Sequence, residues 1–381
     1  MFRLAVAALA CISLSAQEPQ TTDLDAAVKT ANAAYLKGDY EAARQSFLQA
    51  WDQLQQTPPD NPQRYDILKR LVSVRAAAGE FEDANNYLQM AINWREQTSG
   101  PSDPKIADDL LQSVSLFRGL KQFDQALVVM NRVLTLHAHG PAGFESTDIA
   151  DDYSRIAQIQ MEKKDLASGI TFFTRALQIR TKLFGPLDPS LVYDLDRVGA
   201  AYTASRDYPN AEAAFRHALV IRESLYGKNH ADLISTVDGL AYACFGQKKF
   251  DDAEPIYTRL VELWKTSVGK DHPMVALALD KVSVFYIAQK KFDQAKDAAD
   301  QANAIRARFL AEGLSEQATE QFSEGNKEDT VALYQRALKA MDPPNPVYDD
   351  LHKEIEDMLK TIAPMSSKAL IKKTAAPPRK K

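Results

Sequence analysis

A four-residue pattern recurs in this chain with a period of about 42 residues, a spacing typical of repeat proteins, from near residue 40 to near residue 300. Each copy has an aromatic residue or Leu, then Ala or Gly, then a bulky apolar residue, then a small apolar residue, at intervals of three, four and three. The clear copies are Tyr40-Ala43-Phe47-Ala50, Phe81-Ala84-Leu88-Ala91, Phe123-Ala126-Met130-Val133, Leu166-Gly169-Phe173-Ala176, Tyr208-Ala211-Phe215-Ala218 and Phe250-Ala253-Tyr257-Leu260, with a weaker copy at Phe292-Ala295-Ala299-Ala302. A fixed period of this length indicates a solenoid of stacked helical hairpins, and not a globule with one core.

One repeat, residues 191–232, contains two predicted helices. The spacing of Leu195, Val198 and Tyr202 indicates one amphipathic helix. Pro209 suits the first turn of a second helix, and Gly227 suits its C-terminal end. The small residues of the pattern are expected where the two helices cross closely, since a larger side chain there would cost about 1–3 kcal/mol.

These features resemble the tetratricopeptide-repeat (TPR) family. The resemblance rests on the seven copies above and on the inter-helix turns Gly38-Asp39-Tyr40 and Gly79-Glu80-Phe81. The family period is usually about 34 residues. Here the second helix runs on through segments such as residues 221–227, which resembles the kinesin-light-chain-type subclass, in its bacterial exported form. The resemblance implies an all-α fold, a right-handed superhelical solenoid of antiparallel helix pairs whose first helices line a concave groove.

The predicted organisation has five parts. A signal peptide covers residues 1–16, about seven TPR-like repeats cover 24–310, and a degenerate eighth repeat covers 311–342. A capping helix is predicted over 343–364, because terminal repeats need a polar outer face. Residues 365–381 are predicted to be a disordered basic tail.

The N-terminus predicts export to the periplasm or the extracellular space. Arg3 is followed by an uncharged apolar run to Leu14 and by small residues that suit cleavage after Ala16. A run of this length is too short for a transmembrane helix, which needs roughly 20 residues. The alternative is an apolar, frayed N-terminus; a lipid anchor at Cys11 is disfavoured because Leu9 is unusual before such a cysteine.

Charge is unevenly distributed along the chain. Residues 366–381 carry six basic side chains and no acidic one, so the rest of the chain is more acidic than the net charge of −5 suggests. An acidic body disfavours nucleic acid as a partner. For the tail, three readings stay open: electrostatic contact with an anionic lipid or envelope polymer, a solubilising end, and contact with the chain's own acidic body.

Sequence motifs for catalysis, metals or cofactors are absent. The chain has no phosphate-binding loop, no GxSxG, no HExxH and no CxxC. His230 and His272 occupy equivalent connectors in successive repeats, which indicates a role in starting a helix. Cys244 is the one cysteine of the mature chain and is predicted to be buried. The carboxylate pairs near predicted helix starts are explained by the helix dipole; these are Asp108-Asp109, Asp151-Asp152 and Asp251-Asp252. We therefore predict a protein that is not an enzyme and has no metal or cofactor.

One column of side chains is not required by packing. Asp196, Asp238 and Asp280 occupy the same place in the first helix of three consecutive repeats, each one full period after the last. Neighbouring helices lie roughly 8–10 Å apart, where two carboxylates repel by about 0.4 kcal/mol in water. This Asp ladder is a candidate site for a cationic segment, and its alternatives are a solvated or locally paired face and simple repeat ancestry.

Further groove candidates complete the predicted partner-binding site. The aromatic ones are Tyr193, Tyr242 and Phe245, and the basic one is Arg118. Some members of the family clamp a partner's terminal carboxylate with basic residues along the groove. That function is disfavoured, since Lys69 and Arg118 alternate with acidic residues here; these are Asp66, Asp108 and Asp151.

The function predicted from these observations is a non-enzymatic scaffold that binds a peptide or protein segment in the concave groove and selects basic segments through the Asp ladder. Two alternatives stay open: an accessory subunit of an envelope enzyme complex, and an architectural envelope protein that self-associates.

Overall fold

The computed structural model describes residues 21–140 and 143–374, and side chains as far as residue 362. The predicted signal peptide and residues 375–381 lie outside the described residues. The chain divides into two compact units, residues 1–163 and 164–381. Every regular element in the described ranges is a helix, as the all-α prediction requires.

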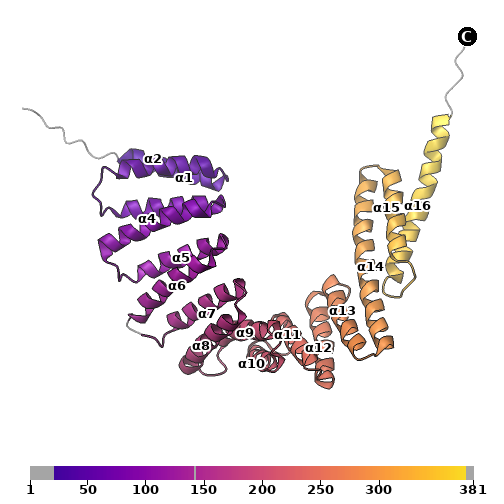
Figure 1. The fold of residues 1–381 in the computed structure, drawn as a ribbon. Helices are drawn as coiled ribbons and strands as arrows, with labels where there is room; N and C mark the ends of the chain where they lie inside the picture. The colour runs from indigo at the N-terminus through magenta and orange to yellow at the C-terminus, as the bar shows by residue number, and fades with distance from the viewer. Residues whose placement is uncertain (1–20, 141–142, 375–381) are drawn as a thin grey trace, which may run out of the picture. The chain divides into compact units, whose positions relative to one another are not determined.

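Unit 1 is a series of helical hairpins in which each helix packs on the next (Figure 1). Its helices are α1 (Thr21–Leu36), α2 (Tyr40–Leu54), α3 (Pro62–Ala77), α4 (Phe81–Ser99), α5 (Lys105–Gly119), α6 (Phe123–Ala138) and α7 (Thr147–Glu162).

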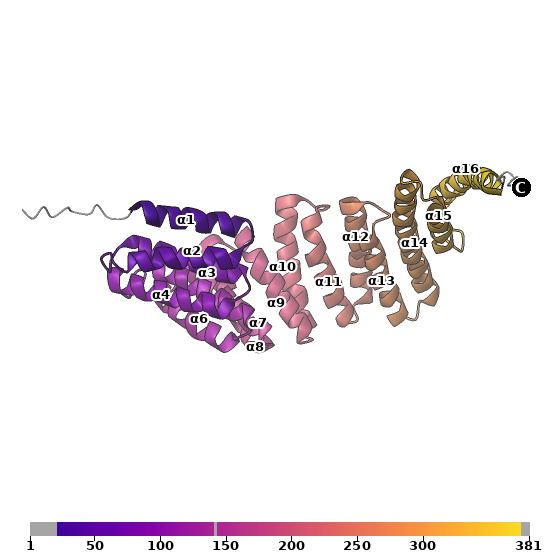
Figure 2. The same cartoon turned by 90° about the horizontal axis from the view of Figure 1, so that it is seen from above.

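Unit 2 continues the same construction, and α10 to α14 lie side by side in chain order (Figure 2). Its first helices are α8 (Leu166–Phe184), α9 (Val192–Ala204), α10 (Tyr208–Tyr226), α11 (Ile234–Gly246), α12 (Phe250–Val268) and α13 (Pro273–Ala288). They are followed by α14 (Phe292–Ser323), α15 (Lys327–Ala340) and α16 (Asp349–Thr374), and the short 3-10 helices η1 (Pro189–Leu191) and η2 (Ala231–Leu233) precede α9 and α11.

Each copy of the recurring pattern begins the second helix of a repeat, from Tyr40 in α2 to Phe292 in α14. The small residues of the pattern are buried, and the ring of Phe215 packs against Gly199 and Gly239 on two neighbouring first helices. Glycine is needed beside this ring: a Cβ atom at Gly239 would lie 2.5 Å from Phe215 Cζ. The prediction that small residues permit the close helix crossing is confirmed.

The turn between the two helices of a repeat requires a left-handed backbone. The first two repeats supply glycine, Gly38 and Gly79, both with positive φ. The following five repeats hold a basic residue at the same place with φ between 58° and 70°; these are Lys121, Lys164, Arg206, Lys248 and Lys290. The glycine signal therefore fades along the chain while the turn geometry stays the same.

The connectors between repeats carry the two equivalent histidines. His230 Nδ1 accepts a hydrogen bond from the backbone N–H of Asp232, and His272 Nδ1 accepts one from Met274, both at 3.2 Å. Each ring thus caps the start of the next helix, as predicted. Cys244 is fully buried, also as predicted.

The C-terminal end differs from the prediction in two ways. The predicted boundary at residue 310 falls inside α14, one continuous helix that packs first on α13 and then on α15. The backbone of α16 is helical to Thr374, which corrects the predicted start of a disordered tail at residue 365. Leu351, Ile355 and Ile362 bury the inner side of α16 against the end of the unit.

Candidate functional site: a groove on unit 2

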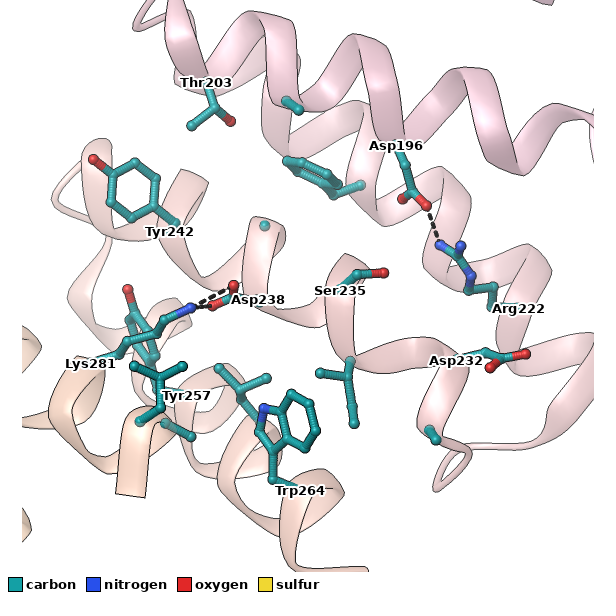
Figure 3. A pocket seen from close by; sticks show the side chains of 18 of the residues that line it. Asp196, Thr203, Arg222, Asp232, Ser235, Asp238, Tyr242, Tyr257, Trp264 and Lys281 are labelled. Atoms are coloured by element: carbon teal, nitrogen blue, oxygen red, sulfur yellow. Dashed lines mark hydrogen bonds and ion pairs between the residues drawn. The ribbon is translucent and has the colours of Figure 1, made fainter. Parts of the chain in front are cut away.

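A groove of about 1730 Å³ lies on unit 2, between Pro189 and Val284. The first helices of three consecutive repeats, α9, α11 and α13, supply most of its lining, and α10 and α12 supply most of the remainder. Figure 3 shows lining side chains such as Asp196, Asp238 and Lys281. Six of the seven predicted partner-binding residues line it: Tyr193, Asp196, Asp238, Tyr242, Phe245 and Asp280. The register of the repeats therefore brought these side chains to one concave surface.

Each carboxylate of the Asp ladder has a cationic partner. Asp196 pairs with Arg222 and accepts a hydrogen bond from Thr236 Oγ1 at 2.9 Å. Lys281 Nζ lies 2.6 Å from both carboxylate oxygens of Asp238. Asp280 pairs with Arg306. The structure therefore favours the locally paired alternative over a row of unpaired charges.

The lining of the groove is mixed in charge. It holds four aspartates, Asp196, Asp232, Asp238 and Asp280, and four basic residues, Arg197, Arg206, Arg222 and Lys281. A long-range attraction for basic ligands is thus weaker than the Asp ladder alone suggests, and any selection depends on individual pairs.

The three aromatic candidates differ in their surroundings. Tyr193 and Tyr242 are about half exposed in the groove, and Arg197 lies 5.3 Å above the ring of Tyr193. Phe245 is mostly enclosed, and its ring centroid lies 6.1 Å from that of Phe285 and 6.3 Å from that of Phe250. The two tyrosines are available to a ligand, whereas Phe245 mainly supports the wall.

The repeat family is decided by three overlapping matches. The family model described as "Tetratricopeptide repeat" matches residues 148–224, 191–259 and 232–308. Residues 148–308 are tetratricopeptide repeats. These TPR units include all six of the predicted residues that line the groove.

Solved structures with this architecture share little sequence with the chain. The C-terminal part of a TPR repeat-containing protein from Cytophaga hutchinsonii has a TM-score of 0.51 and 16% identity, over 73% of this chain and 94% of that one. BtubC (BKLC) from P. vanneervenii has a TM-score of 0.48 and 16% identity, over 63% and 91%. TPR-like repeats of a kinesin light chain from Podosopora anserina give 0.48 and 16%, over 54% and 97%. Curated proteins give no match. The likeness to the Cytophaga protein supports the TPR solenoid fold and nothing about a ligand.

A second periodic column is buried between the TPR repeats and was missed by the sequence reasoning. Arg95 Nε donates to Asp109 at 3.0 Å, and His137 Nδ1 lies 2.7 Å from Asp152. Arg180 pairs with Asp194 in the same way in unit 2. The three carboxylates are almost fully buried, and buried charges need such partners. Burial raises the pKa of Asp152 in spite of its partners His137 and Arg155.

These pairs correct the sequence-based interpretation of two carboxylate pairs. Asp109 and Asp152 are explained by buried ion pairs and not by the helix dipole, although Asp251 and Asp252 do lie in the first turn of α12. The missed signal was the same period. An Arg or His recurs once per repeat at positions 95, 137 and 180, and an Asp recurs likewise at 109, 152 and 194.

Arg118, the seventh predicted residue, is not part of the groove. It belongs to unit 1, where its Nε donates to Glu162 Oε2 at 3.0 Å. Arg118 therefore does not line the groove of unit 2, and a role for it in partner binding stays a prediction.

Two other properties bear on the class of site. In the part of the chain that the structure describes, no three His, Cys, Asp or Glu side chains form a group suited to a metal ion. No helix in that part has the length and apolar character needed to cross a membrane.

Proposed function

We propose that the groove of unit 2 binds an extended segment of another protein, and that the chain works as a non-enzymatic scaffold. TPR repeats fit a role in protein interaction. The observation that carries the proposal is the convergence of six residues, chosen from the repeat register and the family resemblance, on one groove of about 1730 Å³. Interfaces are commonly anchored by exposed aromatic residues surrounded by polar groups.

The lining supports a binding surface more than a catalytic one. The ladder carboxylates are each engaged by a cation or a hydroxyl, and they lie on an open surface shared by three repeats. An active site needs convergent titratable groups with perturbed pKa values in an enclosed pocket. In the proposed scaffold, the aspartates select basic segments by exchanging their present partners.

We also propose where this scaffold acts. The chain is exported, and its basic tail contacts an anionic envelope surface. The support for both is the apolar run before Ala16 and the six basic residues after residue 365.

The test is capture of a partner with matched variants of the mature chain. The groove variant is Tyr193→Ala/Tyr242→Ala, which removes rings that are 46% and 47% exposed. The control is Phe184→Ala, which removes a ring that is 49% exposed on α8 and does not line the groove. A photo-crosslinking amino acid at Ser235 in the groove identifies the bound segment. Partners that crosslink at Ser235, bind the control and are lost from the groove variant support the proposal. Equal capture by all three proteins would contradict it.

A further inference from the structure

Asp238 is the middle rung of the Asp ladder, and Asp196 and Asp280 are its outer rungs. The middle rung lacks the arginine that pairs with each outer rung. Arg222 follows Asp196 at the same interval in the sequence as Arg306 follows Asp280. The residue at that interval after Asp238 is Trp264, which lines the groove and carries no charge. The repeat that holds Asp238 therefore supplies no cation of its own at this position.

Lys281 compensates from the next repeat. Its ammonium is bound by both oxygens of Asp238 at 2.6 Å, and the two side chains are 39% and 37% exposed. A pair this open to solvent contributes little to stability, so another cation can replace Lys281 at small cost. The Asp280–Arg306 pair is similarly exposed, at 40% and 43%. Exposure therefore does not distinguish the middle rung from this pair, and the difference lies in the side chains around Asp238.

Tyr257 supplies a hydrogen-bonding group that no side chain or backbone group of the described residues uses. The residue is only 4% exposed and lines the groove. Burial, and then the nearby Asp238 carboxylate, raise the pKa of its hydroxyl, which therefore stays protonated. The hydroxyl oxygen is not among the buried polar atoms that lack a partner, so it opens to the groove. An unused hydroxyl beside a carboxylate is suited to a polar ligand.

Aromatic rings flank the same place. In the view of Figure 3 the Lys281–Asp238 pair lies between Tyr242 and Trp264, and Tyr257 lies beside it. Aromatic faces attract ammonium groups, and the attraction is stronger where water is excluded. A carboxylate, a free hydroxyl and aromatic rings together match a cation carried on an apolar stem.

We propose that the middle rung is the selective subsite of the groove and binds a lysine side chain of the partner segment, whose ammonium takes the place of Lys281 on Asp238. The inference rests on the proposed function, because it assumes that a peptide segment occupies the groove. Lys281 then competes with the partner's lysine for Asp238. When the partner's lysine binds, Lys281 moves into solvent and Asp238 keeps a cationic partner.

The experiment measures the binding of two short peptides, acetyl-Leu-Lys-Leu-amide and its neutral match acetyl-Leu-norleucine-Leu-amide. The readout is the indole N–H signal of Trp264 by NMR, assigned with Trp264→Phe. Lys281→Met keeps the stem but removes the charge. Lys265→Met is the matched control, since Lys265 is 37% exposed and pairs with Glu262 outside the groove lining.

The expected result is a preference of the wild-type chain for the lysine peptide that increases about three- to tenfold in Lys281→Met and is unchanged in Lys265→Met. Asp238→Asn is expected to remove the preference while leaving binding of the norleucine peptide intact. Circular dichroism of each variant shows whether it is folded.

The possible outcomes distinguish failure of the middle-rung inference from failure of the proposed groove binding. Equal affinity for both peptides, or no effect of Lys281→Met, would overturn the middle-rung inference and leave groove binding in place. Failure of both peptides to shift Trp264 in every folded variant would count against groove binding itself, and with it against the inference.

Discussion

Arg180 on α8 and Asp194 on α9 form an ion pair whose side chains are only 8% and 0% exposed. It belongs to the column that joins the second helix of one repeat to the first helix of the next, with Arg95–Asp109 and His137–Asp152 as its other members. The column makes three successive junctions between repeats depend on a buried carboxylate and its partner.

Replacing Asp194 with Ala is expected to destabilise unit 2 by about 3–5 kcal/mol, because it leaves the guanidinium of Arg180 buried without its carboxylate. The double variant Arg180→Met/Asp194→Leu removes both charges and is expected to recover most of that loss. Urea unfolding followed by circular dichroism measures both. A double variant as unstable as the single one would show that the pair is needed for more than charge balance.

Replacing Gly239 with Ala is expected to destabilise unit 2 despite the better helix propensity of alanine. The added methyl would lie 2.5 Å from Phe215 Cζ and 2.7 Å from its Cε1, and such overpacking costs about 1–3 kcal/mol. Gly313→Ala on α14 is the matched control, because a Cβ atom there meets nothing within 4 Å. The control is expected to stabilise by about 0.5–1 kcal/mol. Thermal unfolding of the two variants should shift in opposite directions.

Glu212 makes the stability of unit 2 depend on acid pH. Burial alone would raise its pKa, but hydrogen bonds from Lys249, Arg216 and Gln247 outweigh burial and lower the pKa from 4.5 to about 2. A lowered pKa in the folded state stabilises above the unfolded value, and this stabilisation is lost as the pH falls from 4.5 towards 2. Glu212→Gln is therefore expected to be less stable than wild type at pH 6, and the gap should narrow at pH 3. A gap of equal size at both pH values would rule out this linkage.

The sequence was sufficient for the helical repeats because each one repeats the same packing problem. Phe215 with Ala211 and Ala218 shows the pattern in a form that needs no knowledge of the rest of the chain. The family resemblance supplied the groove side of the first helices, and the register put Asp196, Asp238 and Asp280 at equivalent places on it; all three line the groove of unit 2.

The pairing of those charges could not be read in the same way. Lys281 reaches Asp238 from another repeat, and Arg222 reaches Asp196 from a different helix. Such contacts depend on side-chain reach across helices, whereas the period reports only position along each helix. Arg118 illustrates the limit, because its register gave no warning that Glu162 would engage it. The continuity of α14 could not be predicted from the sequence either, because no residue near 310 signals whether the helix ends there. It is seen only once α14 packs on α15.

His137 is the one member of the buried column that has no guanidinium, since its equivalents are Arg95 and Arg180, and all three face a buried carboxylate. A guanidinium is permanently charged and can hold a carboxylate with two hydrogen bonds. His137→Arg is therefore expected to stabilise unit 1 by about 1–2 kcal/mol, because it gives the buried Asp152 a permanent cation besides the half-exposed Arg155.

The control for this substitution is His139→Arg, two residues later, where the imidazole is exposed and bonds the backbone carbonyl of Thr135 at 2.7 Å. It should change stability little. Urea unfolding compares the three proteins. No gain for His137→Arg, or an equal gain for His139→Arg, would contradict a contribution from the buried carboxylate of Asp152.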